Sequence, residues 1–257
     1  MRERIGAPAA AILALAGLYF LTPLAMTFAF SLWEGGDRYG FAAYGVLLTS
    51  PLLGQAALLS LELSLATALA LFALLVPATV YMNLEAPWLR PAFEFVAALP
   101  FVVPAIALVA GLTNLYKGPA WLIGSPFYLV IPYFFLALPY AYRAIDVGVR
   151  SIDLPTLTEA GRSLGAGAGR LFWSVILPGL RPAMTGAALL TLAMAFGEFT
   201  FSNVLLFRTY AVYLNDVGQA DPTQASALSA SSFLLTWFAM LGALIVGGGR
   251  AAPAGGR

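Results

Sequence analysis

The sequence predicts an all-α membrane protein whose chain crosses the bilayer six times. Three observations lead to this prediction: 61% of the 257 residues are hydrophobic, only 10% are charged, and the apolar residues gather into six long segments. A soluble domain carries about 25% charged residues, so too few polar side chains remain here to cover a surface that faces water. Lipid must therefore be much of the solvent, and residues 1–257 are expected to form a single transmembrane domain.

Each predicted span is long enough to cross the hydrocarbon core, which takes about 20 apolar residues in a helix. The spans cover residues 8–33, 52–82, 91–116, 127–148, 182–207 and 227–247. Pro100 and Pro104 lie in the third span, and Pro132 and Pro139 in the fourth, where proline can kink a helix. The tail 248–257 is rich in Gly, Ala and Pro and is expected to be flexible.

The basic residues predict the orientation of these spans. With the N-terminus inside and the spans alternating, inner segments hold ten arginines and outer segments hold three basic residues. The inner residues are Arg2, Arg4, Arg90, Arg143, Arg150, Arg162, Arg170, Arg181, Arg250 and Arg257, and the outer ones are Arg38, Lys117 and Arg208. Because short cytoplasmic loops carry an excess of positive charge, both termini are expected to lie in the cytoplasm.

The residue types that the chain lacks exclude several function classes. Without cysteine or histidine, the chain has no disulfide, no Cys/His metal site and no catalytic set that needs a thiol or an imidazole. It contains no G-x-x-x-x-G-K-[ST] loop for ATP phosphates. A net charge of +1 argues against a nucleic-acid partner. The sequence thus predicts a protein that is not an enzyme and that uses no metal or cofactor.

The longest polar segment between the spans covers residues 149–181, on the predicted inner side. Thr156 and Glu159 fit a capping box that starts a short helix ending near Leu164. Three glycines, Gly165, Gly167 and Gly169, are expected to turn the chain sharply after it. A second short helix over residues 170–177 is expected to stop before Pro178, because proline disfavours helix in the preceding residue.

These two helices form a rigid hairpin that is suited to enter a groove on a partner protein. Leu164, Leu171 and Phe172 are expected to supply apolar contacts, and Arg162 and Arg170 to supply positive charge. The alternative is an amphipathic surface hairpin without a partner.

The spacing of residues in this segment resembles the EAA loop of permease subunits of binding-protein-dependent ABC importers. The residues that carry the resemblance are Glu159, Ala160, Gly161, Gly165, Ile176, Leu177 and Pro178. Gly161 stands where the signature has alanine, which keeps the position small but weakens the helix by about 1 kcal/mol. Segments 99–104 and 138–143 also look like this family, and the resemblance covers the chain from Gly54 onward.

The resemblance implies a type I ABC importer (MetI-like) permease fold with a core over residues 50–248. It implies that residues 149–181 form a coupling loop docked on a cytoplasmic ABC ATPase dimer, through Glu159, Ala160, Gly161, Gly165 and Pro178. Closure of the ATPase would move the spans between inward-facing and outward-facing states. The other implied partners are a second permease subunit, as homologue or copy, and an extracytoplasmic substrate-binding protein. The implied location is the bacterial inner membrane.

Several carboxylates lie in or beside the apolar spans, where they must face protein or water. Glu198 lies in the fifth span with Thr200 and Asn203 close by, and the resemblance implies that these residues line the translocation path. The alternative for Glu198 is a hydrogen bond to a neighbouring helix. Glu62 is expected to make an interhelical polar contact.

Glu94 lies four residues after Arg90, one helical turn on. The two side chains are therefore expected to form an ion pair on one helix face.

The Glu198 segment is similar to permeases for polyamines, iron, thiamine and sulfate. Because a carboxylate suits a cation, spermidine or putrescine is the favoured solute, with ferric iron, thiamine or an oxyanion as alternatives. A different class of function is also open, namely an ion-coupled secondary transporter that uses Glu62 and Glu198 and needs no ATP.

Overall fold

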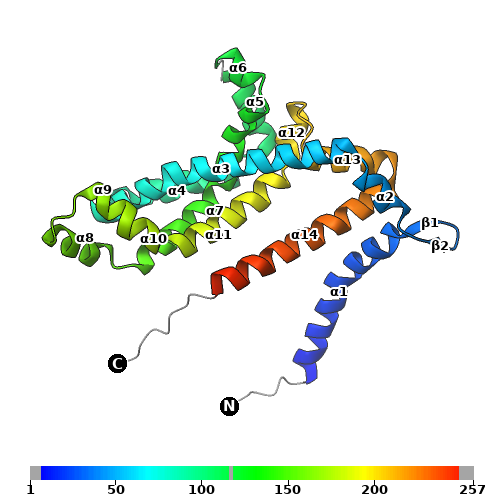
Figure 1. Cartoon of the computed structure of the whole chain (residues 1–257), viewed down its shortest axis with the longest axis horizontal. Helices are drawn as coiled ribbons and strands as arrows, with labels where there is room; N and C mark the ends of the chain where they lie inside the picture. Colours follow the sequence, from blue (N-terminus) through cyan, green and yellow to red (C-terminus); the bar gives the residue numbers. More distant parts are fainter. Residues whose placement is uncertain (1–6, 116–117, 249–257) are drawn as a thin grey trace. The chain divides into compact units, whose positions relative to one another are not determined.

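The computed structural model describes residues 7–115 and 118–248, and nearly all of them are helical (Figure 1). The described residues form two compact units: one holds those up to Gly54 together with those from Tyr213 on, and the other is Gln55–Val212. The predicted tail 248–257, except Gly248, lies outside the described residues, as do Arg2, Arg4, Lys117, Arg250 and Arg257 of the charge pattern. One transmembrane domain over residues 1–257 stays a prediction.

The first unit is built on two long helices, α1 (Ala7–Ser31) and α14 (Pro222–Gly248), which pack along one another. The rings of Phe28 and Phe233 meet edge to face between them, with centroids 6.4 Å apart. After α1 the chain forms a hairpin of β1 (Trp33–Gly35) and β2 (Arg38–Tyr39). Helix α2 (Ala42–Leu48) follows and contacts α14. Helix α13 (Tyr210–Ala220) leads into α14.

The second unit contains the remaining helices. In chain order they are α3 (Pro51–Leu84), η1 (Pro87–Leu89), α4 (Arg90–Val102), α5 (Ala105–Leu115), α6 (Ala120–Ile123), η2 (Pro126–Leu129), α7 (Val130–Ser151), α8 (Leu154–Ser163), α9 (Ala168–Leu171), the π turn η3 (Phe172–Ile176), α10 (Leu177–Gly179), α11 (Arg181–Phe196) and α12 (Thr200–Val204). Helices α3, α4, α7 and α11 run beside one another, and α8 to α10 lie at one end of them (Figure 1).

Two apolar clusters hold this unit together. The main cluster joins α3, α4, α7 and α11, and the smaller one, around Tyr133 and Phe201, joins α3, α5, η2, α7, α11 and α12. Helices α7 and α11 approach closely because small residues face each other, as is common between membrane helices. A side chain at Gly148 would collide with the methyl group of Ala183, so this contact requires glycine.

The structure agrees with most of the predicted spans. Four helical stretches are long and apolar enough to cross a membrane, namely Pro8–Ser31, Pro51–Leu84, Pro126–Ser151 and Arg181–Val204, and they match the first, second, fourth and fifth predictions. Helix α14 contains the sixth predicted segment. Within the described residues the number of candidate spans is four, or five with the bent pair below, so the count of six stays a prediction.

The third predicted span is broken rather than continuous. Helices α4 and α5 meet at an angle of 102° around Pro104. Val103 takes an extended conformation, with φ −87° and ψ 116°, as the residue before a proline prefers. The chain therefore turns sharply where the sequence predicts only a kink.

Candidate functional site

Helix α8 of the predicted coupling loop begins earlier than the sequence suggests. Asp153 is its N-cap, because its Oδ1 accepts a hydrogen bond from the backbone N–H of Thr156 at 3.3 Å. The capping box that starts at Thr156 is therefore wrong, and Glu159 is an exposed residue within the helix. Aspartate is a better N-cap than threonine, and Pro155 suits the first turn that follows.

Replacing Asp153 by alanine is expected to lower the free energy of unfolding by about 1 kcal/mol, because the Thr156 N–H loses its partner. Thr156→Ala is the matched control, and we expect it to change stability by less than about 0.5 kcal/mol. Thermal unfolding of the purified protein in detergent measures both variants. A larger loss of stability from Thr156→Ala than from Asp153→Ala would show that the helix starts with the capping box at Thr156 instead.

The turn after α8 depends on Gly165. Its φ is +79°, a conformation that side chains disfavour. The N–H of Ala166 donates to the Gly161 carbonyl at 2.9 Å, and the N–H of Gly165 donates to the Arg162 carbonyl at 2.9 Å. This pattern is a Schellman motif, which satisfies the last carbonyls of the helix and reverses the chain. The predicted glycine turn is confirmed at Gly165.

The other two glycines of the turn behave differently from the prediction. Gly167 has φ −70° and is the N-cap of α9, and Gly169 lies inside α9. Neither position has a neighbour that an added side chain would meet. Gly165 alone among the three therefore has a conformation that requires glycine.

Gly161 has a separate reason to be small. A side chain there would collide with the Leu171 side chain, which is buried against α8. The two arms of the hairpin are thus packed face to face through this pair. The glycine that departs from the alanine of the family signature permits this close contact, so the element is compact despite the weaker helix propensity.

Pro178 does not end the second helix, which is a correction to the sequence analysis. The chain runs from α9 through the π turn η3 into α10, and Pro178 lies within α10. Proline is tolerated in the first turn of a helical segment, where its missing N–H is not needed. The helical path then reaches α11 after a tight turn at Leu180.

The exposed apolar side chains of this element are not all the predicted ones. Leu164 is 88% exposed and Trp173 is 68% exposed, whereas Leu171 is buried and Phe172 half-buried. Arg170 is exposed. The expected apolar contact through Leu171 is therefore wrong, because this side chain fills the space beside Gly161.

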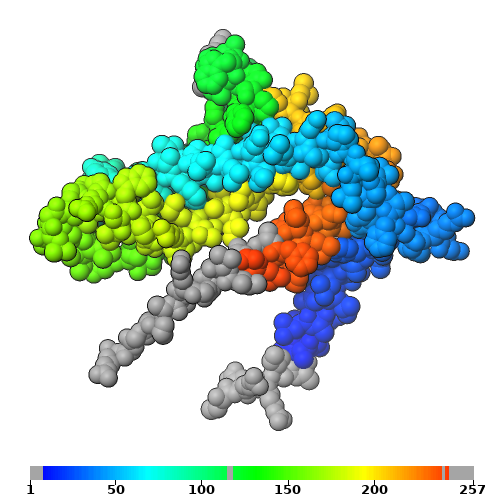
Figure 2. Space-filling model, viewed as in Figure 1, coloured from blue at the N-terminus to red at the C-terminus, as the bar shows by residue number. Residues whose placement is uncertain are grey.

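The element formed by α8 to α10 lies between α7 and α11 in the chain and is packed against both helices. Leu154, Ile176 and Leu180 belong to the main apolar cluster of the second unit. Arg162 also lies 3.7 Å from Glu85 at the end of α3. In the space-filling view the element closes one end of this unit (Figure 2). The element is thus packed against the cluster that joins α3, α4, α7 and α11.

The fifth predicted span is interrupted at Glu198. Helix α11 ends at Phe196, and the short helix α12 starts at Thr200. Glu198 is 8% exposed, and both of its carboxylate oxygens accept from the N–H of Phe201 at 3.0 Å. It also accepts from the N–H and the hydroxyl of Ser202, each at 3.4 Å. The carboxylate therefore satisfies the free N–H groups at the start of α12, where a negative charge is favoured.

The surroundings of Glu198 fix the position of α12. The hydroxyls of Ser202 and Tyr133 are 2.6 Å apart, which joins α12 to α7. Thr200 is half-buried and Asn203 is exposed. The hydrogen bonds of Glu198 differ from the predicted alternative, a bond to a neighbouring helix, because Phe201 and Ser202 lie three and four residues further along the same predicted span. The path-lining role of Glu198, Thr200 and Asn203 stays a prediction.

Glu62 does not make the expected contact. It is exposed on α3, and no hydrogen bond or ion pair links it to another residue that the structure describes.

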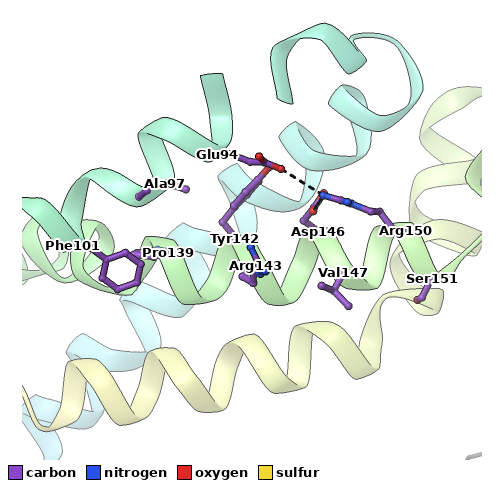
Figure 3. A pocket seen from close by; sticks show the side chains of 11 residues that line it. Glu94, Ala97, Phe101, Pro139, Tyr142, Arg143, Asp146, Val147, Arg150 and Ser151 are labelled. Atoms are coloured by element: carbon purple, nitrogen blue, oxygen red, sulfur yellow. Dashed lines mark hydrogen bonds and ion pairs between the residues drawn. The ribbon is translucent and has the colours of Figure 1, made fainter. Parts of the chain in front are cut away.

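The predicted ion pair between Arg90 and Glu94 is replaced by a larger cluster. Arg90 Nη2 donates to Asp146 Oδ1 at 3.1 Å and to Asn83 Oδ1 at 2.8 Å, while Asp146 also pairs with Arg150. Glu94 lies 3.6 Å from Arg150 (Figure 3). Asp146 thus competes with Glu94 for Arg90 from a neighbouring helix. Sequence reasoning missed Asp146, whose only signal was an acidic residue within an apolar segment.

A pocket of about 540 Å³ lies beside this cluster, between α4 and α7. Figure 3 shows Glu94 of α4 beside Tyr142 of α7, with Arg143, Asp146 and Val147 following along α7. Over the described part of the chain, no group of three or more His, Cys, Asp or Glu side chains is placed to hold a metal ion.

Comparison with known proteins agrees with this arrangement. Residues 76–248 match the model of the family described as binding-protein-dependent transport system inner membrane component. Curated protein sequences gave no match. Among solved structures, the chain resembles part of a bacterial ABC transporter involved in the import of the acidic polysaccharide alginate. The TM-score is 0.70 and the identity is 19%, over 89% of this chain and 91% of that chain.

Proposed function

Because this chain belongs to the family of inner membrane components of binding-protein-dependent transport systems, we propose that it forms the translocation path of an ATP-driven importer. In this proposal residues 149–181 dock on a cytoplasmic ABC ATPase dimer, and Glu159, Ala160, Gly161, Gly165 and Pro178 belong to the docking element. A second permease subunit completes the path, and an extracytoplasmic binding protein delivers a small solute. Both termini lie in the cytoplasm.

One observation carries this proposal: the element formed by α8 to α10 is exposed at its turn and buried at its base. The element exposes Leu164 at its turn and Trp173 on η3, while Leu154, Ile176 and Leu180 at its base are buried in the main apolar cluster. Both exposed apolar side chains are available for contact with a partner protein. The Schellman turn and the contact between Gly161 and Leu171 hold the tip in one shape, so force applied there reaches the helices.

The docking role is tested with Leu164→Asp, which places a charge at the tip without changing the backbone. We expect the ATPase that co-purifies with the permease to fall about tenfold or more, which corresponds to 1.4 kcal/mol of binding. Leu206→Asp is the matched control, because Leu206 is equally exposed but lies beyond α12, with φ +63°, which aspartate tolerates. Equal ATPase recovery in both variants would contradict docking through this element.

An importer of this kind and an ion-coupled secondary transporter give opposite results in vesicles. The complete complex with ATP is expected to accumulate solute, and the permease alone under a sodium or proton gradient is expected to accumulate none. Uptake by the permease alone, lost in Glu62→Gln or Glu198→Gln, would support the secondary transporter instead.

In the proposed translocation path, Glu198, Thr200 and Asn203 near the break in the fifth span have different roles. Asn203 is exposed and offers its amide to a passing solute, Thr200 is half-buried, and Glu198 holds the helix that carries both. Spermidine and putrescine stay the first solutes to test, followed by ferric iron, thiamine and oxyanions. The decisive measurement is the ligand of the binding protein that co-purifies with the complex.

A further inference from the structure

The cluster around Asp146 lies directly behind the coupling loop. Asp146 is on α7, five residues before that helix ends at Ser151. Its carboxylate reaches Arg90, the first residue of α4, and Arg150 on its own helix. Through Arg90 it also reaches Asn83 near the end of α3. The ends of α3, α4 and α7 are therefore linked through Arg90 and the Asp146 carboxylate.

Burial makes this contact different from a surface ion pair. Asp146 is 4% exposed, and a buried charge that loses its partner is strongly destabilising. The pair between Arg150 and Glu94 is longer, at 3.6 Å, and both side chains are about half exposed, so it contributes little. Asp146 also pairs with Arg150, but that contact stays within α7. The contact from Asp146 to Arg90 is thus the stronger of the two ion pairs that join α4 to α7.

The helix end that Asp146 contacts carries no acidic residue of its own. The first turn of α4 contains no acidic residue and begins with Arg90, although the N-terminus of a helix favours negative charge. Asp146 supplies that charge from α7. Helix α4 is therefore fixed to α7 at the end that lies nearest the coupling loop, and α4 leads directly into the bent junction with α5.

We propose that Asp146 is a positioning residue of the transport cycle, which makes α4 move together with α7 and the coupling loop. The inference rests on the proposed function, since it assumes that an ATPase moves the loop. When α8 is displaced, α7 follows because Leu154 of α8 is buried in the main apolar cluster together with α7 residues. The Asp146–Arg90 contact then carries α4 and the α4–α5 bend along. Without it, ATP hydrolysis continues but less of the motion reaches α4.

The chain has no cysteine, so two introduced cysteines report this motion without background from the permease. Phe95→Cys on α4 and Ser163→Cys on α8 are exposed positions for spin labels. The labelled permease is assembled with its ATPase and excess unlabelled permease, and the interspin distance is measured with and without a trapped nucleotide. In the otherwise unchanged protein, one narrow distance is expected in both states, because α4 and α8 move as one body.

In the Asp146→Asn variant, the distance is expected to change or broaden when nucleotide binds. Solute transported per ATP hydrolysed is expected to fall about fivefold or more, the range of a typical coupling energy. Glu94→Gln is the control and is expected to keep one narrow distance. Because Asp146→Asn removes the negative charge that pairs with Arg90 and can reduce folding, the double variant Arg90→Gln/Asp146→Asn removes both charges, and it is expected to show the same uncoupling.

The outcomes separate this inference from the proposed function. If the unchanged complex transports solute and Asp146→Asn keeps both the transport ratio and the narrow distance, Asp146 has no positioning role, although the importer function stands. If the unchanged complex binds no ATPase and accumulates no solute with ATP, the proposed function itself is wrong.

Discussion

Gly165→Val is expected to abolish ATP-driven uptake while the membrane helices stay folded. Gly165 has φ +79°, and a β-branched residue there is a genuine outlier. The backbone must therefore leave this conformation, at a cost of about 1–2 kcal/mol or more, and the two hydrogen bonds of the Schellman turn are lost. The tip of the element then has no fixed shape to present to the ATPase.

Gly167→Val is the matched control for this variant. Gly167 lies two residues further on, has φ −70° and has free space around it, so valine fits without strain. Uptake into vesicles and ATPase co-purification are measured for both variants. Retained uptake in Gly165→Val, or equal loss in both variants, would show that the turn conformation does not matter for coupling.

Glu198→Ala is expected to have the largest effect on stability. Its carboxylate accepts from the N–H groups of Phe201 and Ser202 and from the Ser202 hydroxyl, all in a buried site. Each buried donor left without a partner costs roughly 1–3 kcal/mol. We therefore expect the free energy of unfolding to fall by roughly 2–4 kcal/mol, with α12 losing its fixed start.

The control for Glu198 is Glu62→Ala, the same change in another membrane carboxylate. Glu62 is exposed on α3, so its removal is expected to leave the unfolding temperature within a few degrees of the parent protein. Glu198→Gln keeps one acceptor oxygen, so its unfolding temperature is expected to lie between those of Glu198→Ala and Glu62→Ala. A Glu198→Ala protein that unfolds at the parent temperature would show that its carboxylate is not a structural cap.

The sequence predicts two kinds of feature correctly: helices that are set by the length of an apolar run, and a turn that is set by the positive φ of a glycine. Runs of apolar residues identify most of the spans, and the glycines after Leu164 identify the position of the turn at Gly165. Both signals are local: a span must have a certain length, and a reversed chain at Gly165 needs a residue that adopts positive φ.

The errors arise where two local rules compete or where the partner is distant in sequence. Asp153 and Thr156 both suit an N-cap, and the better acceptor starts the helix. Arg90 has an acidic residue one turn away, yet it binds Asp146, 56 residues further on, because α7 brings that carboxylate to the start of α4. No periodicity in the sequence reports such a contact.

The π turn between α9 and α10 changes the phase of the helical path. Leu171 and Ile176 are five residues apart and both are buried, one against Gly161 and the other in the main cluster. At the 3.6 residues per turn of an α-helix, side chains five apart point about 140° away from each other. A turn closed by i→i+5 hydrogen bonds brings them round to one side. Deleting a single residue there would rotate the hairpin tip out of alignment with α11. The length of this short stretch is therefore fixed by two contacts, that of Leu171 with Gly161 and that of Ile176 with the main cluster.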